Sequence, residues 1–307
     1  LSSSEPKSYA ELCKGLSLPP IGIKKGMHPV IFFGFYYSVE ANMAMYEDGI
    51  FVPYLNDEAV DRIVRKGDHF AFQLHTFKGQ DKLISANSDQ FLNKESKNIL
   101  TIVRAFSKEM KSLPEFTQQT RNLDRISNEA IKLRSAFDSA KSPHDLFTND
   151  IPKALGFIKK DLNKENELTA FIDLLNKTMT ELKSCYGRMI EEQRIKFAQI
   201  FSLDTNLSLD ELQKKILARY SSMEEFTIDN LSLKPFLTRL LADIDPEIWF
   251  EGVLTILENT NPRKWRDDTL LDADIKLKNF SERMKDIEML QSYQANKASS
   301  SDQEIFG

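Results

Sequence analysis

Apolar residues recur three and four positions apart along most of the chain, and this spacing predicts amphipathic helices. After Gly79 the pattern is helical almost to the end, and Pro114 closes the first stripe. The predicted helices cover residues 99–110, 126–137, 165–201, 208–220, 231–242, 245–258 and 267 to about 294, with a short one starting at Ser142-Pro143. The sequence therefore predicts a mainly α fold, with a helical assembly over residues 79–296.

The first 78 residues follow a different pattern. Residues 43–54 predict a β-hairpin, because the Asp48-Gly49 pair supplies the positive φ that a tight primed turn needs. Asn56 has the position of a helix N-cap. The other predicted elements are helices at 8–15, 25–41 and 57–66 and a strand at 69–77. This order predicts a small α+β winged-helix-like module over residues 1–78.

The helix predicted over residues 25–41 is apolar on most of its faces, and we therefore expect it to be buried. Pro29 falls within its first turn, where the missing N–H is tolerated. The last helix is followed by a polar segment, and we expect residues 297–307 to be a mobile tail or a truncated end. Because the chain starts at Leu1 and stops at Gly307, we also expect it to be a piece of a longer polypeptide.

Composition limits the classes of protein to consider. Of the 307 residues, 41% are hydrophobic and 21 are Phe, which is enough to build a substantial core. The net charge is −5 and no segment is strongly basic, so a large phosphate-binding face is not evident. Cys13 and Cys185 are too few and too far apart for a disulfide scaffold, which favours a reducing cytoplasm. No stretch approaches 18 apolar residues, so no membrane span is expected.

The motifs of nucleotide-dependent and hydrolytic enzymes are absent from the sequence. The segment Gly22-Ile23-Lys24-Lys25-Gly26 lacks the spacing with which a P-loop wraps phosphates. We also find no dinucleotide fingerprint, nucleophile elbow or two-histidine metalloprotease helix. No catalytic, cofactor-binding or metal-binding residue is therefore predicted, and the question whether the parent protein is an enzyme stays open.

Two groups of residues allow a metal interpretation. His69 and His75 would lie on one face of the predicted strand, but a zinc site needs three or four ligands, and we favour ordinary histidines. An acidic cluster follows Trp265, and several carboxylates suit a hard cation. The cluster consists of Asp267, Asp268, Asp272 and Asp274. We favour the simpler interpretation that Asp267 caps a helix whose dipole stabilises the early acids.

Cys185 is a weak candidate for a nucleophile. Cys185 falls on the apolar stripe of the predicted 165–201 helix, without a neighbouring histidine. We therefore expect a packed thiol and not a nucleophile.

Nucleic-acid binding is a second interpretation of the N-terminal module. Its candidate contact residues are Lys24, Lys25, Arg62, Arg65 and Lys66, with the hairpin as the wing. A recognition helix carries polar and basic side chains, whereas the 25–41 helix is apolar after its first residues. The pattern therefore favours packing against protein.

Several phrases in the chain resemble one family. They are LPPIGIKKGMHPVIFF, MYEDGIFVPYL, LPEFTQQTRNLDRISNEAIKLRSAFDSAKSPHDLFTNDIPKALG, KPFLTRLLADIDPEIWFEGVLTIL and NPRKWRDDTLLDADIKLKNFSERM. In this order they resemble the region downstream of the nucleotide-binding domain in very large bacterial ATP-binding proteins. Those proteins are similar to AAA-type or signal-transducing P-loop ATPases and are commonly met in phage-defence or restriction-type gene clusters. The resemblance covers nearly the whole chain, and none of the phrases is a catalytic signature.

The resemblance implies that residues 8–77 are a winged-helix-like piece and residues 79–296 a helical region, both following an ATPase core that this chain lacks. Our leading hypothesis is a non-catalytic coupling or sensor region that binds the ATPase domain of the same polypeptide or a partner subunit. The alternatives are a nucleic-acid-binding module and an enzyme built around the two histidines.

Overall fold

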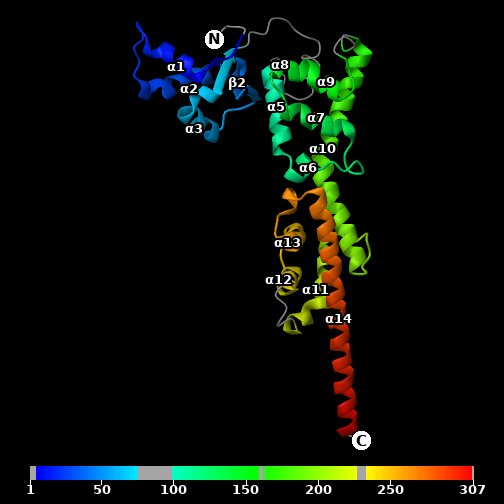
Figure 1. Cartoon of the computed structure of the whole chain (residues 1–307). Helices are drawn as coiled ribbons and strands as arrows, with labels where there is room; N and C mark the ends of the chain where they lie inside the picture. Colours follow the sequence, from blue (N-terminus) through cyan, green and yellow to red (C-terminus); the bar gives the residue numbers. More distant parts are fainter. Residues whose placement is uncertain (1–4, 75–98, 159–161, 163, 227–232, 306–307) are drawn as a thin grey trace. The chain divides into compact units, whose positions relative to one another are not determined.

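The computed structural model describes residues 5–74, 99–158, 162, 164–226 and 233–305. The chain is mainly α with a small four-stranded antiparallel sheet near its N-terminus, which confirms the predicted fold class (Figure 1). It divides into two compact units. Unit 1 comprises Leu1–Leu113 and Ser127–Glu181, and unit 2 comprises Pro114–Ile126 and Leu182–Gly307. The boundary predicted near residue 78 lies outside the described residues and stays a prediction.

The sheet belongs to unit 1 and has the strand order β1-β4-β2-β3. Its strands are β1 (Lys7–Ser8), β2 (Met43–Glu47), β3 (Ile50–Val52) and β4 (Phe70–Leu74). The predicted hairpin is confirmed: Asp48 and Gly49 both have positive φ, at 49° and 81°, and they join β2 to β3. The predicted 69–77 strand is confirmed over β4, and its end lies outside the described residues.

Three helices accompany this sheet: α1 (Tyr9–Ser17), α2 (His28–Ser38) and α3 (Asp57–Arg65). Two of these helices, α1 and α3, have an N-cap side chain that accepts a hydrogen bond from the first turn. Ser8 forms a capping box with Glu11, and Asn56 Oδ1 accepts from the Ala59 N–H at 2.8 Å, as predicted for Asn56. The core of this N-terminal module is aromatic, since Phe32 lies edge-on to Phe72 with ring centroids 4.6 Å apart.

The helix predicted over residues 25–41 is shorter than expected. Lys25–Met27 forms a 3₁₀ turn, η1, and α2 begins at His28. Pro29 explains this start, because a residue without an N–H fits the first turn of a helix. After Ser38 the chain leaves the α conformation at Val39, and a second 3₁₀ turn covers Glu40–Asn42 (η2).

The expected burial of this helix is half wrong. His28, Phe32 and Tyr36 are buried against the sheet side, whereas Val30 and Tyr37 on the other side are 64% and 58% exposed. The physical reason is the size of the module. A four-stranded sheet with short strands covers one side of a helix, and the described residues of unit 1 place nothing over the other side.

The rest of unit 1 is helical. Its elements are α5 (Ile99–Ser112), α7 (Asn128–Asp138), α8 (Pro143–Asp145), a π-helix η4 (Leu146–Asp150), α9 (Ile151–Ala154) and the first part of α10 (Glu165–Ile200). The predicted stripe of α5 is confirmed, because Ile102, Val103 and Phe106 are buried. Ser142 caps α8 as its sequence position predicts.

Unit 2 packs shorter helices against the second part of α10. Its elements are α6 (Glu115–Gln119), α11 (Leu209–Tyr220), a 3₁₀ helix η6 (Ser221–Phe226), α12 (Leu233–Leu240), α13 (Pro246–Glu258), a 3₁₀ helix η7 (Pro262–Lys264) and α14 (Asp267–Ile305). Two buried indoles anchor its core. The Trp249 N–H donates to the Leu240 carbonyl and the Trp265 N–H to the Thr260 carbonyl, both at 2.9 Å.

Helix α14 is longer than predicted, since it continues past Gln294 to Ile305 (Figure 1). The predicted end followed the loss of the apolar stripe. However, residues 295–305 contain neither Pro nor Gly, the residues that break a helix, so helical backbone is sterically allowed there. Among the described residues, no helix combines the length and the apolar character that crossing a bilayer requires.

Candidate functional site

The two candidate metal groups do not form a ligand cage in the described part of the chain. His69 Nδ1 lies 2.7 Å from Asp48 Oδ1 at the hairpin turn, and both side chains are exposed. His75 lies outside the described residues. Within those residues, no cluster of three or more His, Cys, Asp or Glu side chains could hold a metal ion.

The acidic cluster at the start of α14 has separate structural partners. Asp267 accepts from the Thr120 hydroxyl at 2.7 Å and from the Arg121 N–H at 3.0 Å, and Asp274 pairs with Lys196. The prediction that Asp267 caps its own helix is therefore corrected. Because Asp267 is the first residue of α14 and not the residue before it, its carboxylate binds the 120–121 segment instead.

Both cysteines are buried in apolar surroundings. Burial raises the pKa of the Cys13 thiol more strongly than the hydrogen bond with Tyr9 lowers it. A raised pKa keeps the thiol protonated at neutral pH, and a protonated thiol is a poor nucleophile. Cys185 belongs to the core of unit 2, in agreement with the packed thiol expected from the sequence.

The predicted nucleic-acid contacts fall on two elements. Lys24 and Lys25 are exposed at the start of η1, whereas the other three lie at the end of α3. Arg62 makes a two-pronged ion pair with Glu47, at 2.9 Å and 3.0 Å. Arg65 Nε lies 3.0 Å from Asp61 Oδ1, and Lys66 is the exposed C-cap.

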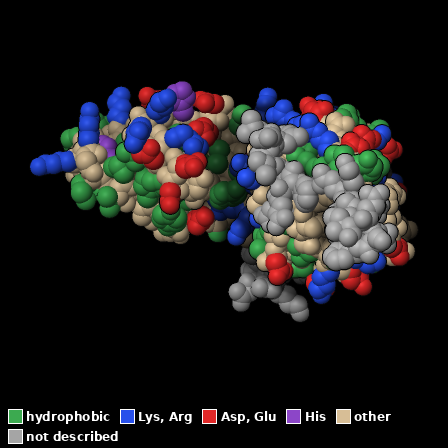
Figure 2. All heavy atoms as spheres, turned by 90° about the horizontal axis from the view of Figure 1, so that it is seen from below, with side chains coloured by type: hydrophobic (Ala, Val, Ile, Leu, Met, Phe, Trp, Pro, Cys, Tyr) green, Lys and Arg blue, Asp and Glu red, His purple; other side chains and the backbone are tan. Residues whose placement is uncertain are grey.

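These ion pairs matter for the charge that the module presents. On the face in Figure 2, Lys and Arg side chains of the N-terminal module are interspersed with Asp and Glu side chains. A carboxylate that holds a guanidinium competes with a phosphate for the same donors. Nucleic-acid contact through Arg62 and Arg65 stays a prediction that requires these pairs to open.

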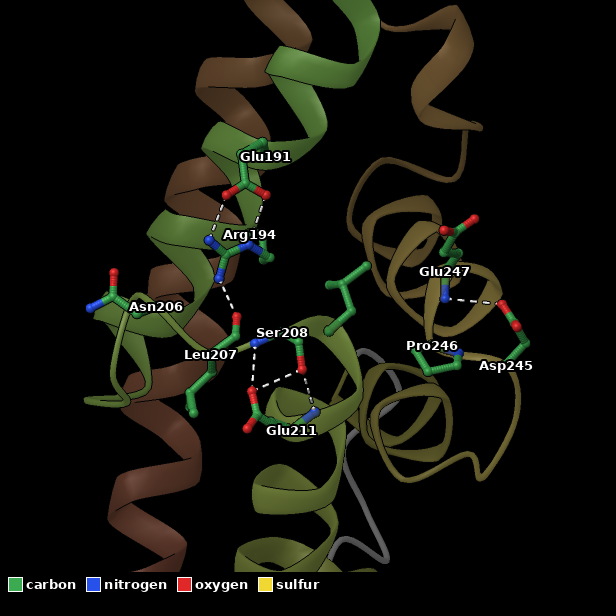
Figure 3. Close-up of a pocket in the computed structure, with 10 residues that line it drawn as sticks. Glu191, Arg194, Asn206, Leu207, Ser208, Glu211, Asp245, Pro246 and Glu247 are labelled. Carbon is green, nitrogen blue, oxygen red and sulfur yellow. Dashed lines mark hydrogen bonds and ion pairs between the residues drawn. The ribbon is translucent and has the colours of Figure 1, made fainter.

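A pocket of about 620 Å³ in unit 2 is lined by four carboxylates, and Figure 3 shows that three of them have structural partners. Glu191 pairs with Arg194, whose Nη1 also donates to the Leu207 carbonyl. Glu211 closes a capping box at the start of α11, and Asp245 Oδ1 accepts two N–H groups of α13. Two of these three carboxylates thus cap helices α11 and α13, and the third holds the Arg194 side chain in place.

A second pocket, of about 630 Å³, lies in unit 1 along α5. Arg104, Lys108 and Lys111 line it from one face of the helix. Arg104 donates to three backbone carbonyls, and Lys111 lies 5.0 Å from the centre of the Tyr54 ring. The described contacts of Arg104 and Lys111 are therefore with the protein's own groups.

The solvent side of α2 exposes large apolar side chains. Val30, Gly34 and Tyr37 follow one another at four- and three-residue spacing, which places them on one face. Met27, immediately before the helix, continues this line and is also exposed. We call these four residues the α2 outer face. An apolar helix with one face buried and the other exposed presents a contact surface for a further structure.

Gly34 lies in the middle of the α2 outer face and faces open space. A glycine inside a helix costs about 1 kcal/mol relative to alanine. An added Cβ at Gly34 would meet no atom within 4 Å, and its φ is not in the left-handed region. The described structure therefore gives no internal reason for this glycine. The same holds for Gly187 in α10, so the open space at Gly34 describes the α2 outer face and assigns it no partner.

Sequence reasoning missed the α2 outer face because it assigned the apolar run to the core. The small size of the module was the available signal. A helix that is apolar on all sides must be packed against other elements on every side, and a module of this size has too few elements to do so. The chain matches no family model, no curated protein and no solved structure.

Proposed function

We propose that this chain is a non-catalytic coupling region of a large cytoplasmic ATPase. In this proposal, the α2 outer face binds the ATPase domain of the same polypeptide, or that of a partner subunit, and passes on its nucleotide state. The observation that carries the proposal is the exposure of Val30 and Tyr37 on either side of Gly34. The family resemblance supplies the identity of the partner and a setting in phage defence.

The charged residues beside the α2 outer face indicate which charges its partner surface should carry. Lys24 and Lys25 are exposed at the start of η1, three and two residues before Met27 of the α2 outer face. An apolar surface beside two cations is complemented by an apolar centre with an acidic margin. We therefore assign Lys24 and Lys25 to contact with a protein partner and not with phosphate groups.

The test is a titration of this chain with the ATPase domain of its parent protein, followed by calorimetry with and without ATP. Val30→Asp places a charge in the centre of the contact, and we expect it to weaken binding about tenfold or more. Val64→Asp is the matched control, since Val64 is also an exposed valine on a helix of the same module. Equal affinities for the two variants would contradict the proposal.

Two further readouts separate the alternatives. Robust ATP hydrolysis by this chain alone would refute a non-catalytic role. Duplex DNA is titrated at low salt, because phosphate contacts make binding strongly salt-dependent. Salt-dependent binding that is lost when Lys24 and Lys25 are changed to Ala would favour the nucleic-acid hypothesis instead.

A further inference from the structure

Helix α14 buries one apolar face and exposes large apolar side chains on the opposite side. The inner face packs into unit 2, where Leu270, Ala273, Leu277 and Met284 are buried. On the opposite side Leu271, Ile275, Met289 and Tyr293 are between 59% and 68% exposed. These four, with Lys278, Glu282 and Asp286, form the α14 outer face. Consecutive members are three or four residues apart, so they lie along one line of the helix.

The inner face is fixed by specific contacts, which determine how α14 is rotated. Phe280 stacks on Phe236 with ring centroids 4.7 Å apart, and Glu288 accepts two bonds from Arg219 at 2.6 Å and 2.8 Å. Lys276 pairs with Glu258 at 2.9 Å. The helix cannot rotate to bury the α14 outer face without breaking these contacts.

The α14 outer face is symmetric about Glu282. Leu271 and Tyr293 lie eleven residues before and after it, Ile275 and Met289 lie seven residues before and after it, and Lys278 and Asp286 lie four. In an antiparallel pair of α14 helices centred on Glu282, apolar residues therefore face apolar residues at both ends. Lys278 of each copy faces Asp286 of the other, which gives two opposite-charge pairs by symmetry.

A parallel pair of α14 helices in register would place like charges opposite each other. Lys278 would face Lys278 and Asp286 would face Asp286, so that every charged position would oppose a like charge. In the antiparallel pair only Glu282 faces its own copy. Charge complementarity thus selects the antiparallel arrangement.

We infer that a second copy of this chain covers the α14 outer face, as an antiparallel homodimer with its two-fold axis at Glu282. The contact spans about 33 Å from Leu271 to Tyr293 at the α-helical rise. It carries four large apolar side chains from each copy. The inference concerns unit 2 and is independent of the α2 outer face.

The first test is a charge exchange followed by sedimentation equilibrium at concentrations up to about 100 µM, where a contact of modest affinity is populated. Lys278→Asp should weaken the dimer about tenfold or more, and adding Asp286→Lys to it should restore the dimer. Circular dichroism checks that both variants stay helical. A monomeric wild-type chain, or a double variant no better than the single one, would overturn the inference.

The second test uses engineered cysteines, because the native Cys13 and Cys185 are both buried. In the antiparallel dimer, Ile275→Cys alone should not crosslink, whereas a mixture of Ile275→Cys and Met289→Cys chains should form a disulfide between copies. Crosslinking by Ile275→Cys alone would show a parallel pair and overturn the proposed arrangement. Glu282→Leu removes the like charges at the axis and should tighten the antiparallel dimer about tenfold.

Discussion

The guanidinium of Arg104 in α5 donates from Nη2 to the carbonyl of Met43, the first residue of β2, at 2.8 Å. The same side chain donates to the carbonyls of Glu40 and Pro53, at 2.6 Å and 2.7 Å. These acceptors stand at the start of the hairpin and just after its end. One cation therefore holds both ends of the hairpin of the N-terminal module.

We predict that Arg104→Met lowers the free energy of unfolding by about 2–4 kcal/mol, because three carbonyls lose charged donors in a half-buried site. Urea unfolding followed by circular dichroism measures the change. Arg65→Met is the control, since Arg65 is exposed and its ion pair is with Asp61 on the same helix. Its effect should stay within about 0.5 kcal/mol. Similar losses in both variants would contradict the role given to Arg104.

Two glycines in helices of unit 2 should respond to alanine with opposite signs. At Gly187 in α10 an added Cβ would meet nothing within 4 Å, so Gly187→Ala should stabilise by about 0.5–1 kcal/mol. At Gly252 in α13 the Cβ would overlap the guanidinium of Arg239, which donates to the Ile248 carbonyl. Arg239 can move its guanidinium aside but then loses the bond to the Ile248 carbonyl, so Gly252→Ala should destabilise by about 0.5–1 kcal/mol. Thermal unfolding measures the change in Tm of each variant. A change in Tm of the same sign in both would contradict the packing described for α13.

Stability of unit 2 should depend on pH through Glu191. Hydrogen bonds from Arg194 lower the pKa of the Glu191 carboxyl. A group whose pKa is lower in the folded state contributes stability above its unfolded pKa, of about 4.3 for Glu, and this contribution is lost as pH falls through the folded pKa. Glu191→Gln should therefore lower Tm at pH 7 and converge with the wild type in acid. A constant difference in Tm from pH 7 to pH 3 would contradict this coupling.

Local signals in the sequence predicted much of the backbone. The hairpin was predictable because Asp48 and Gly49 supply the turn by themselves. Helix α10 was predictable because its apolar stripe continues over its full length. Strand β1 was not, because its two residues form a strand only by pairing with Phe72 and Ala71, far along the chain.

The candidate site was less accessible to sequence reasoning than the fold. The apolar run in the sequence shows that both faces of α2 are apolar. It does not show which face the module buries, because that depends on the tertiary packing of Phe32 against Phe72. In the same way, the charges of Arg62 and Arg65 are visible in the sequence. Their pairing with Glu47 and Asp61 is visible only in the structure.

We propose that the α2 outer face contacts an ATPase domain. The most direct measurement is photocrosslinking of the intact parent protein in its own cells, with Tyr37→p-benzoylphenylalanine compared with Val64→p-benzoylphenylalanine as the control position. Our account predicts that position 37 yields a crosslinked peptide from a P-loop ATPase domain and that position 64 does not. Crosslinks to nucleic acid, or equal yields at the two positions, would contradict it.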